Sequence, residues 1–388
     1  MENINMENNT TVKGFSAAYA ACGLKKNNAH DIALIYSEVP AVSAAVFTTS
    51  KVKAAPVVLS MENMVHGTAR AIIVNAGNAN ACTGEQGLKN ARETTRMVAE
   101  ALGITPGEVL AASTGVIGAQ LDMEKVEKAI PELVKNLAPS NISGVVRAMM
   151  TTDSFPKVSS FSEKVKGVDY HVIGIAKGAG MIMPNMATML CFIITDINIS
   201  RGLLRRALAN GTGNSFNKIT VDGDTSTNDT VFIMANGLAG NEEPDEASFT
   251  EFQKGLTGIM YDLAKMIVKD GEGATKVIHI SVKGAATPDD ANKAARTIAN
   301  SSLVKTAFFG EDPNWGRIMA ALGRSGIVMK ENRVDILIDN IKIVGQGLGR
   351  GFEAEKEAAL MMKNPEISLT VELNIGQFSD WITTCDLT

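Results

Sequence analysis

The sequence predicts a layered α/β fold. Short β-branched and apolar runs recur between stretches whose apolar residues are spaced three and four apart, the spacing of amphipathic helices. Alternation of the two element types favours packed layers of sheet and helix over a sandwich or a helix bundle. The chain has 388 residues, of which 45% are hydrophobic, so it can bury a sizeable core. At roughly 150 residues per domain it is two to three domains or one large one.

The expected strands are short runs bounded by turns. They are Ile32–Ile35, Ala44–Thr48, Ala71–Val74, Val109–Ala112, Val172–Ile175, Met189–Thr195, Val231–Met234, Val277–Val282, Ala307–Phe309, Val334–Ile338 and Ile367–Leu373. The expected helices are Glu85–Leu102, Asp122–Leu137, Arg201–Asn214, Glu246–Lys269, Asp289–Ser301 and Pro313–Leu322. No Pro- or Ser-rich linker and no repeat separates them, so composition predicts no domain boundary.

Charge and residue usage exclude several classes. The chain has 37 Lys plus Arg and 42 Asp plus Glu, a net charge of −5, which argues against a nucleic-acid binder. Its four cysteines form no CxxC pattern, so we expect reduced thiols in the cytoplasm and no metal site. The start, Met1–Lys13, is polar and unlike a signal peptide. The longest apolar runs, such as Met189–Ile194, are far shorter than the roughly 18 residues that span a membrane.

The segment KGAGMIMPNMATMLC, from Lys177 to Cys191, differs from the rest of the chain. By residue type alone it is a glycine-rich turn with a buried methionine cluster. It lacks the spacing of a phosphate-binding loop. A second interpretation starts from Thr188: if the bond before it is cut, its new α-amine, with a pKa near about 7.7, can act as base for its own hydroxyl. The presence of only four histidines fits an enzyme that makes its own base.

This segment closely resembles the self-cleavage signature of the ornithine acetyltransferase family. Six other segments resemble family segments in the same order: Asn75–Cys82, Ser113–Gly118, Met150–Asp153, Thr220–Asp229, Asp270–Lys276 and Gly310–Arg317. The resemblance implies a two-lobed fold around an N-terminal-nucleophile-type cleft that holds Thr188. It also implies self-cleavage between Ala187 and Thr188, which leaves an α chain of residues 1–187 and a β chain of residues 188–388.

The activity implied by the resemblance is transfer of an acetyl group from N2-acetylornithine to glutamate through an acetyl-Thr188 intermediate, in arginine biosynthesis. The implied assembly is an α2β2 heterotetramer without metal or cofactor, binding neither nucleic acid nor membrane. Whether acetyl-CoA is also a donor is left open.

The resemblance assigns roles to further residues. Thr114 and Gly115 match the oxyanion-hole pair, whose donors are typically worth about 2.7–4 kcal/mol each. Thr151, Lys177 and Glu272, together with Thr188, match substrate-binding positions. Residue type alone gives plainer interpretations: a strand-to-loop turn at Thr114, a helix cap at Thr151 or its neighbour Thr152, and surface charges at Lys177 and Glu272.

Several other segments are given no catalytic role. The run Asp222–Asp229 lacks the spacing of a calcium loop, so we expect buried turn hydrogen bonds near the active site. Asn314–Arg317 is expected to pack or to form an interface. We hypothesise a closed pocket, lined by a methionine cluster, that keeps water from the acetyl ester. This cluster is Met181, Met183 and Met186. We expect all four histidines to be structural: His30, His66, His171 and His279.

Chains of the family usually continue past a segment like Thr384–Leu387 with an Asn and a terminal Ser or Thr that contact substrate. We expect weaker substrate binding in a chain without them. Two alternative functions stay open from the residues: a self-processing N-terminal-nucleophile amidohydrolase or aminopeptidase, and an unprocessed amino-acid-binding protein.

Overall fold

The computed structural model describes residues 11–183 and 189–387, which form two compact α/β units. The first unit contains the described residues of 11–178, 189–217 and 225–264. The second contains those of 179–183, 218–224 and 265–387. The chain therefore passes between the units several times, and the segment just before residue 184 belongs to the second unit while residue 189 belongs to the first.

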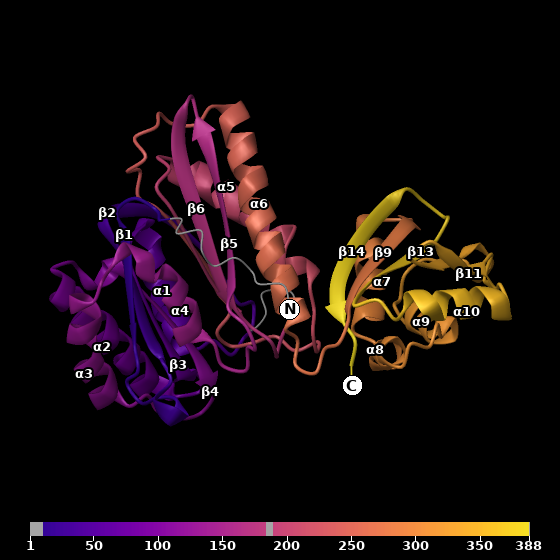
Figure 1. Ribbon diagram of the computed structural model, residues 1–388, viewed down its shortest axis with the longest axis horizontal. Coiled ribbons are helices and arrows are strands. Elements are labelled where there is room, and N and C mark those ends of the chain that lie inside the picture. Colours follow the sequence, from indigo (N-terminus) through magenta and orange to yellow (C-terminus); the bar gives the residue numbers. More distant parts are fainter. Residues whose placement is uncertain (1–10, 184–188, 388) are drawn as a thin grey trace. The chain divides into compact units, whose positions relative to one another are not determined.

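The first unit is built on a mixed sheet with the strand order β4-β3-β2-β8-β7-β6-β5, and β1 pairs with β2 (Figure 1). Its strands are β1 Phe15–Ala20, β2 Ile32–Phe47, β3 Thr68–Asn78, β4 Val109–Val116, β5 Lys157–Val165, β6 Val168–Lys177, β7 Leu190–Thr195 and β8 Thr230–Ala235. The pairs β3–β4 and β7–β8 are parallel and the others are antiparallel. The strands β7 and β8 are thus central, between β2 and β6.

Helices cover both faces of this sheet. They are α1 Ala55–Asn63, α2 Gly84–Leu102, α3 Met123–Lys135, α4 Ile142–Met149, α5 Arg201–Gly213 and α6 Glu246–Lys269. On β2, alternate residues enter different cores: Ala33 and Ile35 pack in the core that includes α4, and Ile32 and Leu34 in the core that includes α2 and α3. This alternation is the period of two expected for a strand buried on both faces.

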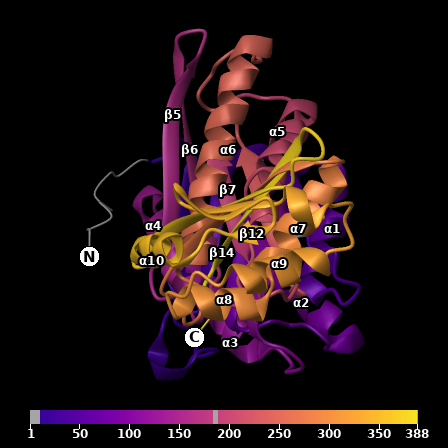
Figure 2. The ribbon, with the colours of Figure 1, turned by 90° about the vertical axis from the view of Figure 1, so that its right-hand side faces the viewer.

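The second unit has a six-stranded sheet in the order β12-β11-β10-β13-β9-β14. Its strands are β9 Val277–Ala285, β10 Asp335–Ile338, β11 Ile341–Gly345, β12 Leu348–Gly349, β13 Glu366–Glu372 and β14 Phe378–Cys385, and its helices are α7 Pro288–Ala299, α8 Ser302–Phe309, α9 Trp315–Gly323 and α10 Phe352–Met361. All four helices contribute to one apolar core with the sheet. Figure 2 labels these four helices. One face of the sheet is therefore covered by helices.

The predicted layered α/β fold is confirmed, and the six predicted helices are α2, α3, α5, α6, α7 and α9. Two expected strands, Ile32–Ile35 and Ala44–Thr48, join in β2, whose pairing with β3 shifts register between Tyr36 and Ala41. The predicted strand Ala307–Phe309 is wrong, because these residues end helix α8, which the Ser301 hydroxyl caps.

All four cysteines lie within the described residues and are free thiols, as expected. Within the described residues, no helix is long and apolar enough to cross a membrane.

Candidate active site

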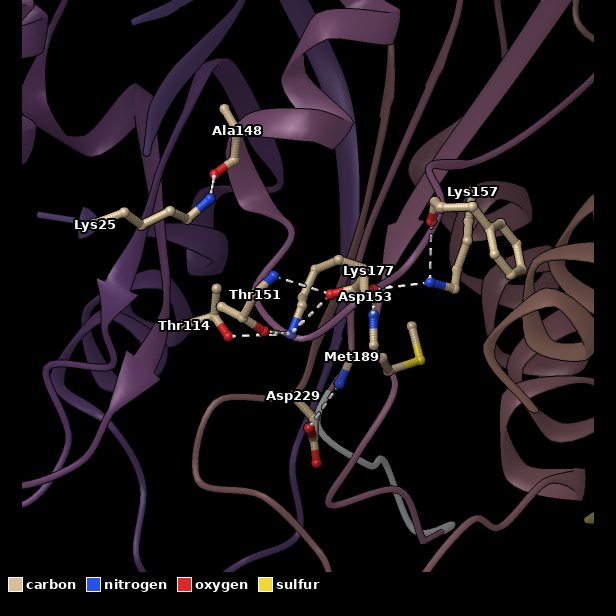
Figure 3. Close-up of polar contacts among 11 residues, drawn as sticks. Lys25, Thr114, Ala148, Thr151, Asp153, Lys157, Lys177, Met189 and Asp229 are labelled. Carbon is tan, nitrogen blue, oxygen red and sulfur yellow. Dashed lines mark hydrogen bonds and ion pairs between the residues drawn. The ribbon is translucent and has the colours of Figure 1, made fainter. Parts of the chain in front are cut away.

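The Lys177 ammonium lies at the end of β6 between two threonine hydroxyls (Figure 3). Its Nζ donates to Thr151 Oγ1 at 2.8 Å and to Thr114 Oγ1 at 3.4 Å, and it lies 3.7 Å from Asp153 Oδ2. Lys177 is only 2% exposed, which corrects the surface-charge interpretation. Burial lowers the pKa of Lys177, and the Asp153 carboxylate opposes this. Lys177 is therefore a fixed, buried cation that polarises two hydroxyl groups.

Asp153 forms ion pairs with two buried lysines, Lys157 and Lys177. Its Oδ1 accepts from Lys157 Nζ at 2.8 Å and from the Gly178 N–H at 2.6 Å, and its Oδ2 accepts from the Thr151 N–H at 3.0 Å. The side chains of Asp153 and Lys157 are fully buried. Burial opposes ionisation of Asp153, but Lys177 and Lys157 outweigh it and lower its pKa to about 2. The carboxylate is therefore charged and holds Thr151 and Lys177 in place.

Thr114 and Gly115 lie within β4, which continues through both residues, so the expected strand-to-loop turn is wrong. Thr114 is 3% exposed and pairs with Ala76, while Gly115 pairs with Gly77, next to a register shift. Gly115 has a φ of +132°, and a Cβ there would lie 2.4 Å from the Gly77 carbonyl carbon. Only glycine fits this close approach of two backbones.

A buried carboxylate meets the start of β7. Asp229, fully buried, accepts the Met189 N–H on Oδ1 at 3.1 Å, and its Oδ2 has no hydrogen-bond partner among the described residues. Burial raises the pKa of Asp229 well above its usual value. Leu190, which follows Met189, pairs with Lys177 of β6 on one side and with Thr230 of β8 on the other. Asp229 and Lys177 thus approach the start of β7 from its two neighbouring strands.

Asn228 ties this strand end to the Thr114 segment. Its Nδ2 donates to the carbonyls of Ala79, at 2.7 Å, and Ser113, at 2.8 Å, and it is 4% exposed. The Ser113 hydroxyl in turn donates to Asn75 Oδ1 at 2.6 Å. The expectation that Asp222–Asp229 makes buried turn hydrogen bonds is therefore confirmed at Asn228 and Asp229. These contacts fix the position of Thr114 on β4.

The segment 179–183 is held within the second unit. Asp222 Oδ1 accepts the Ile182 N–H at 2.9 Å, its Oδ2 accepts the Met181 N–H, and the Ile182 carbonyl accepts the Val221 N–H at 2.6 Å. Met181 is 38% exposed, so it is not part of a buried methionine cluster. Met183 Sδ lies 4.0 Å from Asn300 Nδ2. The buried methionine cluster is thus wrong at Met181, while the pocket that keeps water from the ester stays a prediction.

Glu272 contacts the same segment. Its N–H donates to the Ala179 carbonyl at 3.0 Å, and a Cβ on Gly180 would lie 2.6 Å from Glu272 Oε1. The carboxylate therefore lies directly over Gly180, and the side chain is exposed. Glu272 thus belongs to the second unit, with the residues that precede the predicted cut.

The structure brings together Thr114, Gly115, Thr151 and Lys177 of the predicted site. Ala187, Thr188 and Met186 lie outside the described residues. The other sequence interpretations agree with packing roles: Asn314 caps α9, Trp315 Nε1 donates to Glu355 Oε1 at 3.1 Å, and His279 contacts Thr383 and Glu366.

Sequence reasoning gave no individual role to Asp153 or Lys157, and it gave Asp229 only turn hydrogen bonds. A signal existed for the first two, since Asp153 follows Thr151 by two residues and precedes Lys157 by four. Nothing in the spacing, however, reveals that both side chains are buried or that Lys177 joins them from a separate strand.

The chain forms two α/β units, and the first carries a buried cluster of charged and hydroxyl side chains. The pKa values of Asp153 and Lys177 in this cluster are shifted, as is typical of an active site, so the class of protein is an α/β enzyme. The sequence profile of the ArgJ family matches residues 16–388. The chain is 50% identical over 378 residues to the "Arginine biosynthesis bifunctional protein ArgJ" of Geobacter sulfurreducens, covering 97% of this chain and 96% of that protein. The chain therefore belongs to the ArgJ family.

Two more similarities were found. The protein of the same name from Desulfotalea psychrophila is 48% identical over 377 residues, covering 97% of this chain and 96% of that one. The crystal structure of arginine biosynthesis bifunctional protein argJ from Bacillus halodurans is 44% identical, covers 50% of this chain and 92% of its own, and superposes with a TM-score of 0.47.

Proposed function

We propose that this protein transfers the acetyl group of N2-acetylornithine to glutamate, releasing ornithine and N-acetylglutamate. The observation that carries the proposal is the position of Lys177, buried between the hydroxyls of Thr114 and Thr151 and paired with Leu190, two residues after Thr188. Together with membership in the ArgJ family, it supports a site assembled around the start of β7. Thr188 is the proposed nucleophile.

The proposed reaction has two halves. The Thr188 hydroxyl attacks the acetyl carbonyl, its proton passes to the α-amine of Thr188, and that proton then leaves with the departing ornithine amine. The amine of glutamate then attacks the resulting ester, the bond between the acetyl carbon and the Thr188 oxygen breaks, and a proton from that amine passes through the Thr188 α-amine to the Thr188 oxygen. Each half forms an oxyanion. Because Thr114 Oγ1 accepts from Lys177, its own O–H is free to donate to that oxyanion, with the Gly115 N–H as the second donor.

Maturation is part of the proposal. Cleavage between Ala187 and Thr188 supplies the α-amine and leaves an α chain of residues 1–187 and a β chain of residues 188–388. Thr151, Lys177 and Glu272 are proposed to bind substrate. By resemblance to the family we further propose an α2β2 assembly in the cytoplasm, without a metal or other cofactor.

An acetyl-transfer assay tests the function. Purified protein receives N2-acetylornithine or acetyl-CoA, each with glutamate or with buffer alone, and both N-acetylglutamate and free acetate are measured. The proposal predicts N-acetylglutamate from N2-acetylornithine at a rate well above acetate release. Acetate release that glutamate does not suppress indicates an amidohydrolase, and no turnover by a single uncut chain indicates a binding protein. The acetyl-CoA arm decides whether there is a second donor.

A further inference from the structure

Lys25 is a second cation near Thr114. It lies in the loop between β1 and β2, which packs against Gly77 of β3. The Asp31 carboxylate, fully buried, accepts the N–H groups of Cys22 at 2.7 Å, Leu24 at 2.6 Å and Lys25 at 2.8 Å. A carboxylate that binds three consecutive or near-consecutive N–H groups fixes the backbone of that loop. The position of Lys25 is therefore set by the fold.

The stem of Lys25 rests on Gly77, the residue that pairs with Gly115. A Cβ on Gly77 would lie 2.7 Å from the Leu24 carbonyl oxygen and 3.3 Å from Lys25 Cγ. Gly77 has a φ of +97°, so both its backbone conformation and the space around it require glycine. The loop of Lys25 thus packs directly against the β3–β4 pair that carries Thr114 and Gly115.

The Lys25 ammonium has unused hydrogen-bonding capacity. Its Nζ donates to the carbonyl of Ala148 at 2.7 Å (Figure 3). It also donates to the carbonyl of His30 at 2.8 Å. An ammonium has three N–H donors, and the third has no acceptor among the described residues. No carboxylate of the described residues forms an ion pair with Lys25. Ala148 lies in the last turn of α4, three residues before Thr151. The Lys25 ammonium is therefore held at the end of α4 that leads to Thr151.

The charges around Lys25 favour an anion. Lys177 and Lys157 share the single carboxylate of Asp153, and the Asp31 carboxylate is occupied by backbone donors. Burial lowers the pKa of Lys25, the Asp31 carboxylate opposes this, the Lys177 charge lowers the pKa further, and the Asp153 carboxylate opposes that effect. Three lysines, Lys25, Lys157 and Lys177, thus share two carboxylates, Asp31 and Asp153, and a carboxylate ligand would balance the remaining positive charge.

We infer that Lys25 is a substrate-binding residue that contacts, together with Lys177, the α-carboxylate common to N2-acetylornithine and glutamate. The inference rests on the proposed function. The α-carboxylate is favoured over the side-chain carboxylate of glutamate because both substrates of a ping-pong reaction occupy one site. A cation at the far end of the side chain would repel the ammonium of N2-acetylornithine.

The test compares K25M with wild type, using K25R as the conservative variant and K26M, which changes the exposed neighbouring lysine, as the matched control. Donors are N2-acetylornithine and its decarboxylated analogue N-acetyl-1,4-diaminobutane; acceptors are glutamate and glutamine. For K25M we expect KM to rise on the order of 10- to 100-fold for N2-acetylornithine, glutamate and glutamine alike, with kcat changed little. The decarboxylated donor should react equally with both proteins, while K25R recovers much of the loss and K26M resembles wild type.

Several results would overturn the inference. A KM increase for glutamate alone places the contact at the side-chain carboxylate. An equal loss with the decarboxylated donor, or a fall in kcat with unchanged KM, makes Lys25 a structural residue. Unchanged KM values in an active K25M remove Lys25 from the site and leave the proposed function intact, whereas a wild type that transfers no acetyl group defeats both.

Discussion

Met189 donates its backbone N–H to the buried carboxyl group of Asp229 at 3.1 Å. Met189 follows the proposed nucleophile directly in sequence, so this bond fixes the first described amide after it. Asp229 can keep this role as a neutral group, because burial raises its pKa and an uncharged carboxyl oxygen still accepts a hydrogen bond.

The role of Asp229 predicts different outcomes for two variants. Asp229→Asn retains an oxygen acceptor, so we expect self-cleavage within about tenfold of wild type. Asp229→Ala leaves the Met189 N–H unpaired and opens a cavity, at a cost of about 1–3 kcal/mol, and we expect cleavage to slow much more. Denaturing gels over time measure the uncut fraction. Equal cleavage rates for the two variants would show that the bond does not position Thr188.

Asp153 predicts a loss of stability in acid. Its pKa is lowered from 3.8 to about 2, so its contribution, about 2 kcal/mol, is fully present above the ordinary pKa and is lost as pH falls through about 2. Asp153→Asn should abolish this part of the pH dependence. The variant also leaves Lys157 and Lys177 without their counter-charge, at a cost of about 3–5 kcal/mol. Denaturant unfolding between pH 2 and pH 6 provides the comparison; parallel curves for variant and wild type would contradict the assignment.

Gly115 predicts a sharp intolerance of any side chain. In Gly115→Ala the new Cβ would meet the Gly77 backbone at 2.4 Å, in addition to strain of about 1–3 kcal/mol from the positive φ. Gly118→Ala is the matched control, because Gly118 also has a positive φ, +88°, but nothing lies within 4 Å of its Cβ. We expect the first variant to lose at least tenfold in activity and the second to stay near wild type. Similar activities would show that the β3–β4 contact is not required.

These residues also show what sequence could predict. The long amphipathic helices were predictable because their apolar residues keep a helical period over many turns, as in α2 and α6. The strand at Ala307–Phe309 was wrong because three apolar residues carry no period. Thr114 and Lys177 could be proposed because their segments resemble those of a known family, but their burial and mutual contact depend on strand pairing. Asp153 and Lys25 needed the structure, since their partners are distant in sequence.

The sheet topology predicts that the two chains stay together after the cut. Strand β7 pairs with β6 of the proposed α chain, and β8 pairs with β2 of the same chain. These ladders place strands of the β chain in the middle of the sheet, where separating them would expose a buried core. Cleaved protein should elute as one species in native size-exclusion chromatography and give two bands on a denaturing gel. Separate native peaks for the two fragments would contradict this arrangement.

The acetyl-Thr188 intermediate is the central claim, and intact-mass analysis tests it most directly. Protein treated with N2-acetylornithine in the absence of glutamate is denatured in acid and its fragments are weighed. The account predicts a fragment that begins at Thr188 and carries one acetyl group, which sequencing places on Thr188 and which glutamate removes. An active protein whose chain is uncut, or whose acetyl group lies on another residue, would contradict the account.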